Sequence, residues 1–432
     1  AALGILVDEG KITWETKVID IIPEFRLYNA YVTEDFNIKD LLTHRSGMGL
    51  GAGDLMLWPD SSTFTREEII HNLRYLKQTS SFRTKYDYDN LLYLVAGEVV
   101  ARVSGQSWEQ FIGERIMQPL GMDRSSPSPG MTRDRSNMID AHVPVDGVLQ
   151  VVPIYESDLL NPAGGIISSV ADMTKWVMMH LNHGKYGENN GSQLLQERTH
   201  REMWTPQTII PVRGSSPYKS HFAAYGLGWG LTDVGGYLQA SHTGGLAGIV
   251  TQVTMIPELK LGIIVFTNQQ EGSAFSAISN TIKDGYLGIT GNDWVKTLKE
   301  NVERNSASAR KITDEIWAKV EANRSKTGAA EDHSVYAGTY SDKWFGDIVI
   351  SEEGGNLRFR SVRSPRLRGE MLFYTGNTFI VRWDDRSMDA DAFAVFTLDK
   401  DGKPSSFSME AISPLTDFSY DFHDLFLIRK SN

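Results

Sequence analysis

The chain has 432 residues, of which 41% are hydrophobic and 22% are charged, and it contains no cysteine. This length and composition are typical of a globular protein with more than one domain. The formal net charge of -11 disfavours nucleic acid or an anionic membrane as a partner, because both reward clustered Lys and Arg. Without cysteine the chain can form no disulfide, no thiolate zinc site and no cysteine nucleophile. No run approaches the ~18 apolar residues of a membrane span.

The chain opens with AALGILVDEGK, whose apolar residues have helical spacing but no N-cap in front of them. This pattern predicts the interior of a helix that starts before Ala1. Residues 1–293 then mix helical and strand-like periods, which predicts an α+β domain. The helical periods are clearest in residues 90–103 and 170–181, and the strand-like runs cover residues 227–231, 251–256 and 261–267.

Residues 294–332 are polar and charged with scattered apolar positions, which predicts one or two helices followed by a linker. Residues 333–432 contain short alternating runs separated by the turn sequences EEGGN, YTGN and DKDGK. We predict a small antiparallel sheet there, closed into a barrel. The predicted strands are residues 336–340, 346–350, 356–360, 378–383, 392–398, 405–409 and 425–428.

Tyr88 and Asn90 lie on a polar turn directly before a predicted helix. A phenol and a carboxamide at this spacing can point together into a cleft, where a phenol can transfer protons. The alternative is a core tyrosine followed by an asparagine that caps the helix, which is the commoner meaning of an isolated Tyr-x-Asn.

A second polar stretch runs from His242 through Thr243 and Gly244 to Gly245, between two predicted strands. Glycines at a strand end let a substrate approach the backbone, and an exposed N–H there can donate to an oxyanion. The alternative is a hairpin turn with a surface histidine.

The order of these segments resembles the serine β-lactamase-like family, which includes class C β-lactamases, family VIII esterases, DD-peptidases and D-aminopeptidases. That family carries Ser-x-x-Lys, then Tyr-x-Asn, then Lys or His followed by Thr-Gly. The segments LLTHRSGMG, NPAGGIISSVADMTKWVMMHLNHGKY and YGLGW match it as well. The resemblance implies a β-lactamase/transpeptidase-like domain over residues 1–293, a helical linker over 294–332 and a lipocalin-like barrel over 333–432.

In this family Ser-x-x-Lys lies in the first turn of a helix that continues into a stretch like AALGILVDEGK. The resemblance therefore implies that nucleophile and lysine lie upstream of Ala1. An internal Ser-x-x-Lys, Ser216 to Lys219, lies in a loop-like segment after Tyr88, and we interpret it as a chance match.

The resemblance also implies roles for the matched residues. Tyr88 and the lysine would handle the proton of the serine, and nearby cations, including His242, would favour the Tyr88 phenolate. Asn90 would bind the substrate carbonyl or amide, and the Gly245 N–H would complete the oxyanion hole. The remaining residues of this strand end, Thr243 and Gly244, would contact substrate.

His180 and His183 could share a metal, but no acidic ligand accompanies them at a recognised spacing, so we predict a solvated helix end instead. The DKDGK sequence at Asp399 resembles the opening of a calcium loop, and MDADAF near Asp389 is also acidic. We predict polar turns at both, and no metal or other cofactor.

Two functions follow from these patterns. The first is a serine hydrolase that acts on a small-molecule or peptide substrate, as an esterase, D-aminopeptidase or DD-peptidase; a histidine at position 242 favours these over β-lactamase activity. The second is a catalytically silent protein of the same fold that binds a peptide or acyl ligand in the cleft or the barrel. The resemblance implies a periplasmic or secreted location, and the residues do not fix the oligomeric state.

Overall fold

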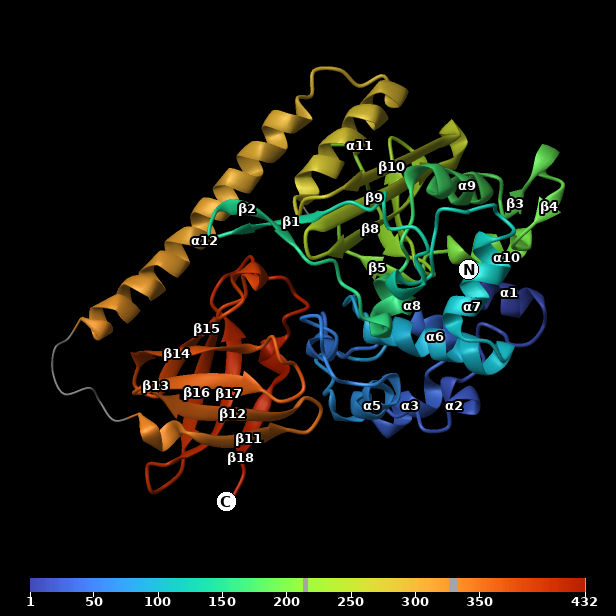
Figure 1. Ribbon diagram of the computed structural model, residues 1–432. Coiled ribbons are helices and arrows are strands. Elements are labelled where there is room, and N and C mark those ends of the chain that lie inside the picture. The colour runs from blue at the N-terminus through green and yellow to red at the C-terminus, as the bar shows by residue number, and fades with distance from the viewer. Residues whose placement is uncertain (213–216, 326–332, 432) are drawn as a thin grey trace. The chain divides into compact units, whose positions relative to one another are not determined.

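The computed structural model describes residues 1–212, 217–325 and 333–431, and its contacts divide the chain into two compact units (Figure 1). The first unit comprises residues 1–49, 77–144 and 149–298, and the second comprises residues 50–76, 145–148 and 299–432. The first combines helices with an antiparallel sheet, and the second contains a closed barrel. The predicted fold class is confirmed.

The first unit is built on an antiparallel sheet in the strand order β10-β9-β8-β7-β6-β5. Its strands are β5 (Thr208–Ile210), β6 (Ala223–Tyr225), β7 (Gly230–Val234), β8 (Tyr237–Leu246), β9 (Ile249–Ile256) and β10 (Leu261–Thr267). The predicted strands at 251–256 and 261–267 are confirmed. The predicted strand at 227–231 is wrong over most of its length, because Gly228 has a φ of 86° and turns the chain between β6 and β7.

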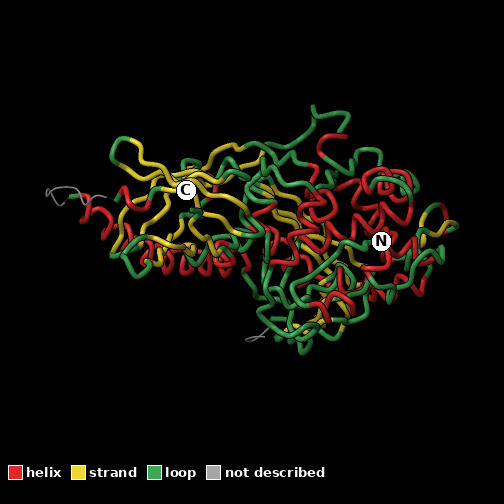
Figure 2. The backbone as a smooth tube through the Cα atoms, turned by 90° about the horizontal axis from the view of Figure 1, so that it is seen from below, coloured by secondary structure: helices red, strands yellow, loops and turns green. Residues whose placement is uncertain are grey.

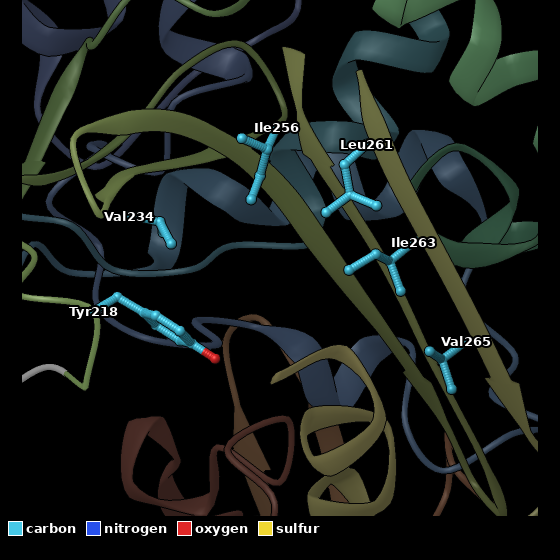
Figure 3. Close-up of a cluster of buried hydrophobic side chains, with 6 residues drawn as sticks. All are labelled: Tyr218, Val234, Ile256, Leu261, Ile263 and Val265. Carbon is cyan, nitrogen blue, oxygen red and sulfur yellow. The ribbon is translucent and has the colours of Figure 1, made fainter. Parts of the chain in front are cut away.

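The apolar run of β10 reflects helices that lie against both faces of the strand. Leu261, Ile263 and Val265 point into a buried cluster that is completed by side chains of α11 (Gly272–Leu287). Figure 3 shows these side chains on one side of the strand. A Cβ on Gly262 would lie 2.4 Å from Val177 of α9 (Val170–Leu181), so the alternate positions face α9. A strand covered on both faces reads as continuously apolar.

Helices of the first unit lie around this sheet, and most of them come before β5 in the sequence. The predicted helix at 170–181 has the observed bounds of α9, and the predicted helix at 90–103 is α6, shifted by one residue. The others are α1 (Ala2–Asp8), α2 (Val18–Ile21), α3 (Ala30–Asp35), α4 (Ile38–Leu41), α7 (Trp108–Ile112), α8 (Asn161–Gly164) and α10 (Glu197–Met203), while α6 spans Leu91–Ser104. Short strand pairs are β1 (Ala141–Val145) with β2 (Val148–Val152), and β3 (Lys185–Tyr186) with β4 (Ser192–Gln193).

The prediction of a solvated helix end at His180 and His183 is wrong for His180, which is buried, whereas His183 is exposed as predicted. His180 is completely buried, and its Nδ1 lies 3.0 Å from Nε2 of His200. The rings of Trp176 and Trp229 pack against it at 4.5 and 5.1 Å. Burial and the neighbouring His200 keep the pKa of His180 well below its ordinary value, so this pair is an uncharged part of the core.

The barrel of the second unit closes in the order β11 to β18, with every neighbouring pair antiparallel. Figure 2 draws strands in yellow, and those of the barrel lie around the C label. Its interior is packed with aromatic rings, and the ring of Phe396 lies 4.9 Å from that of Phe407 and 5.8 Å from that of Phe379. These rings form the core of the barrel. The strands are β11 (Gly338–Asp342), β12 (Gly346–Glu353), β13 (Asn356–Ser361), β14 (Arg368–Thr375), β15 (Thr378–Trp383), β16 (Ala392–Leu398), β17 (Pro404–Ala411) and β18 (Phe426–Arg429).

One barrel strand, β14, is absent from the sequence-based prediction. Leu372 and Ile380 pair across β14 and β15 and point out of the barrel, where Ile316 and Val320 of α12 (Trp294–Arg324) cover them. An outward apolar position breaks the alternation that marks a strand with one exposed face. The helix α12 confirms the helical prediction for this part of the chain, and the DKDGK segment is the predicted turn, between β16 and β17.

Residues 50–76, which include α5 (Arg66–Asn72), pack against the barrel within the second unit. The buried carboxylate of Asp421 accepts hydrogen bonds from the backbone N–H groups of Gly53 and Leu55, at 2.6 and 2.9 Å. Arg363 pairs with Glu68 at 2.5 Å. This segment therefore belongs with the barrel although it follows LLTHRSGMG in the chain.

The contacts assign residues 50–76 and most of α12 to the barrel unit, whereas the sequence suggested divisions at 293 and 332. Those divisions concern independent folding and remain a prediction, which separate expression of residues 333–432 would test. No helix within residues 1–212, 217–325 and 333–431 has the length and apolar content needed to cross a membrane.

Candidate active site

The structure brings together side chains from the two polar stretches singled out in the sequence. Tyr88 and Asn90 lie directly before α6, and His242 lies on β8. The ring centroids of Tyr88 and His242 are 6.2 Å apart. A phenol and an imidazole therefore approach each other where the start of α6 meets the sheet, and Asn90 lies two residues after the phenol.

The start of α6 is capped by Asp89. Asn90 occupies the N-cap position but makes no side-chain capping bond, so its interpretation as a capping asparagine is wrong. The Asp89 carboxylate instead accepts hydrogen bonds from the N–H groups of Leu91 and Leu92, and the hydroxyl of Ser46 lies 3.3 Å away. Burial of the carboxylate raises the pKa of Asp89 to about 7, against the opposing effect of these bonds.

The raised pKa of Asp89 makes its contribution to stability depend on pH. The folded protein holds a proton that the unfolded chain releases, so this stabilisation is lost as the pH rises from about 4 through about 7, at about 1.4 kcal/mol per pKa unit. Asn has the same acceptor oxygen and no charge. We expect the melting temperature of Asp89→Asn, relative to the parent chain, to increase between pH 5 and pH 8. The exposed control Asp401→Asn should show no such trend, and a constant difference for Asp89→Asn would contradict the raised pKa.

Both ring nitrogens of His242 are occupied by neighbours. Its Nδ1 lies 2.6 Å from the carbonyl oxygen of Thr243 and therefore donates, and its Nε2 lies 2.8 Å from the hydroxyl of Tyr225. Burial lowers the pKa of His242, although the bond to Thr243 opposes this effect. His242 is therefore neutral at pH 7, and the suggestion that it supplies positive charge beside Tyr88 is wrong.

The strand end after His242 is open. Thr243, Gly244 and Gly245 are exposed, and β8 continues to Leu246 before the chain turns into β9. A Cβ on Gly244 would lie 2.4 Å from the hydroxyl of Thr251, whereas one on Gly245 would meet nothing within 4 Å. These residues belong to a strand and His242 is half-buried, so the alternative of a hairpin turn with a surface histidine is wrong.

Other rings of this site were not predicted from the sequence. His44 lies 4.1 Å from Tyr88 and 4.7 Å from Tyr225, measured between ring centroids. Tyr93, in the first turn of α6, donates a hydrogen bond from its hydroxyl to the carbonyl of Leu42 at 3.0 Å. The sequence did contain a signal for two of them. His44 lies in LLTHRSGMG and Tyr225 lies in YGLGW, two of the segments that match the family.

Two Ser-x-x-Lys matches occur within the chain. Ser216 lies outside the described residues. A second match, Ser308 to Lys311, escaped the sequence analysis; both side chains are exposed on α12, and the Ser308 hydroxyl donates to the carbonyl of Arg304 at 3.0 Å. That bond is ordinary for a serine inside a helix. Within the part of the chain that the structure describes, no three His, Asp or Glu side chains gather as a metal site would require.

Comparison with known proteins identifies the family. The model of the Beta-lactamase family matches residues 1–284, which is more than half of the chain. This chain belongs to the Beta-lactamase family. A domain of unknown function, DUF3471, matches residues 322–429 and so covers the barrel.

Characterised relatives and solved structures agree with this assignment. The unguisins hydrolase of Aspergillus campestris is 24% identical over 94% of this chain and 77% of its own length. The D-alanyl-D-alanine-carboxypeptidase/endopeptidase of Escherichia coli is 24% identical over 66% of this chain and 72% of its own length. The octameric penicillin-binding protein homologue of Pyrococcus abyssi has a TM-score of 0.59 at 19% identity, covering 99% of this chain and 85% of its own. Membership of a hydrolase-containing family is therefore shown.

Proposed function

We propose that this protein is a serine hydrolase that cleaves an ester, amide or peptide bond through an acyl-enzyme. The observation that carries the proposal is the distance of 6.2 Å between the ring centroids of Tyr88 and His242. Asn90 lies two residues after Tyr88, and Gly245 lies on the same strand as His242. The serine and lysine of this mechanism would come from a Ser-x-x-Lys turn outside residues 1–432. The relatives named as a peptidase and an unguisins hydrolase support the same bond class.

In the proposed mechanism the serine hydroxyl attacks the substrate carbonyl and its proton passes to the lysine and Tyr88. Asn90 holds the carbonyl or amide of the substrate in place. The N–H of Gly245 donates to the oxyanion, and losing one such donor typically costs about 3 kcal/mol of transition-state stabilisation. The proton then passes to the departing alcohol or amine as the ester or amide bond breaks, which leaves the acyl-enzyme. Water attacks the acyl carbonyl and gives up a proton to the same pair, and that proton returns to the serine oxygen as the acid product leaves.

The neutral state of His242 favours substrates without a carboxylate next to the scissile bond. A lysine at this position would attract such a carboxylate, whereas His242 is neutral and has both nitrogens engaged. Esters and amides of D-amino acids are thus the preferred candidates, and β-lactams and acyl-D-Ala-D-Ala peptides the weaker ones.

The experiment uses an extended chain, defined as residues 1–432 with a Ser-x-x-Lys helical turn joined ahead of Ala1. We expect it to hydrolyse p-nitrophenyl butyrate and D-alanine p-nitroanilide, with L-alanine p-nitroanilide and the β-lactam nitrocefin as comparison substrates. Residues 1–432 alone should match buffer. A folded extended chain without activity on any of these substrates would favour the alternative of a catalytically silent binding protein.

A further inference from the structure

His44 occupies the centre of the aromatic cluster around Tyr88. It follows α4 in the chain and is 1% exposed. Its ring lies 4.1 Å from the ring of Tyr88 and 5.3 Å from that of Tyr93. Its φ of 50° is in the left-handed region, which is unusual for a residue other than glycine. Such conformations persist where the surroundings enforce them, and they are frequent at functional sites.

Two backbone hydrogen bonds tie His44 to the turn that carries Tyr88. The carbonyl of His44 accepts from the N–H of Asp87 at 2.9 Å, and Nδ1 of its ring accepts from the N–H of Asp89 at 3.0 Å. The two donors, Asp87 and Asp89, therefore lie on either side of Tyr88 in the chain. The bond to Nδ1 also fixes the position of Asp89, which directly precedes Asn90.

The bond to Asp89 defines the protonation of the ring. Because Nδ1 accepts, the neutral ring carries its proton on Nε2. Burial and the neighbouring His242 keep the pKa of His44 well below its ordinary value, so the ring stays neutral. Nε2 has no hydrogen-bond partner among residues 1–212, 217–325 and 333–431. The ring is therefore held at the cost of one unpaired donor, which a residue with a purely space-filling role would not require.

We infer that His44 is a positioning residue for Tyr88 and Asn90, and that its Nδ1 acceptor does the positioning. The inference rests on the proposed function, since it assigns a purpose to the geometry of those two side chains. Removing the acceptor leaves the Asp89 N–H unpaired in a buried place and frees the turn to shift. A displacement of about 1 Å at a reacting group can cost about 100-fold in rate.

Two substitutions separate the acceptor from the ring. His44→Asn places an amide oxygen close to the position of Nδ1, and Asn tolerates a positive φ. His44→Phe keeps an aromatic ring against Tyr88 and has no acceptor. The matched control is His221→Asn, at a histidine whose side chain is 76% exposed.

The first measurement is hydrogen exchange of the Asp89 amide by NMR, in residues 1–432 as they stand. We expect slow exchange in the parent chain, in His44→Asn and in the control, and exchange at least about tenfold faster in His44→Phe. The second measurement is the kinetics of the extended chain. We expect kcat to fall about 100-fold in His44→Phe and less than about tenfold in His44→Asn, with KM changed less than about threefold in both.

The two variants must differ for the inference to stand. Equal kcat values for His44→Asn and His44→Phe, or a parent-like kcat for His44→Phe, would overturn it even if Tyr88→Phe were inactive. A parent-like kcat for Tyr88→Phe would instead overturn the proposed function. If His44→Phe lacks a cooperative melt, His44→Ala, which also lacks the acceptor, replaces it under the same criteria.

Discussion

Replacement of Tyr88 by Phe is expected to lower kcat of the extended chain about 10²- to 10⁴-fold, the usual contribution of a positioned proton-transfer group. Phe keeps the ring that packs 4.1 Å from His44 and removes only the hydroxyl. The melting temperature should therefore change little. Steady-state kinetics with p-nitrophenyl butyrate, together with thermal melts, measure both quantities.

The control for this prediction is Tyr237→Phe, which removes a partly exposed hydroxyl on β8, the strand that carries His242. Its kcat should stay within about twofold of the parent value. A Tyr88→Phe variant with near-parent turnover would show that the Tyr-x-Asn motif is not the proton-transfer element. A large loss in both variants would point to general damage to the sheet.

Replacement of Phe396 by Ala is expected to destabilise the barrel by about 3–5 kcal/mol, which is the usual cost of removing a fully buried phenylalanine ring. Phe396 is 1% exposed, and its ring lies 4.7 Å from that of Tyr336 and 4.9 Å from that of Phe407. The cavity left inside a closed barrel can collapse only in part, because the surrounding strands are hydrogen-bonded to each other. Urea unfolding of the full chain measures the loss.

The matched control is Phe426→Ala on β18, where the side chain is 58% exposed. Its free energy of unfolding should stay within about 0.5 kcal/mol of the parent value. Because residues 50–76 pack against the barrel, the Phe396→Ala variant should also expose that segment to proteolysis. A similar loss in both variants would contradict the aromatic interior as the source of barrel stability.

Local sequence patterns predicted the helices and strands whose apolar side chains lie on one buried face. The helix at 170–181 was predicted with its observed bounds because its apolar positions recur at helical spacing. The barrel strands were found where inward and outward positions alternate. The exception was β14, where α12 covers an outward face, and no local pattern reveals a cover that comes from another part of the chain.

The same limit applies to the site. Tyr88 and His242 were found because their motifs have a recognisable order, and the structure brings their rings within 6.2 Å of each other. The neutral state of His242 depends on its burial, and the partner of its Nε2, Tyr225, arrives from β6. His44 bonds to a turn 45 residues further along the chain. Burial and partners of this kind arise only when separate elements pack together.

The central claim is that this protein is a serine hydrolase whose Ser-x-x-Lys turn lies outside residues 1–432. The most direct test is to react the protein with a fluorophosphonate probe and to measure its intact mass. The extended chain should gain one adduct, located by peptide mapping on the serine of the added turn, and its Ser→Ala variant should gain none. Residues 1–432 alone should also gain none. An adduct on Ser216, on Ser308 or on any other serine of residues 1–432 would contradict the account, and so would an unlabelled but folded extended chain.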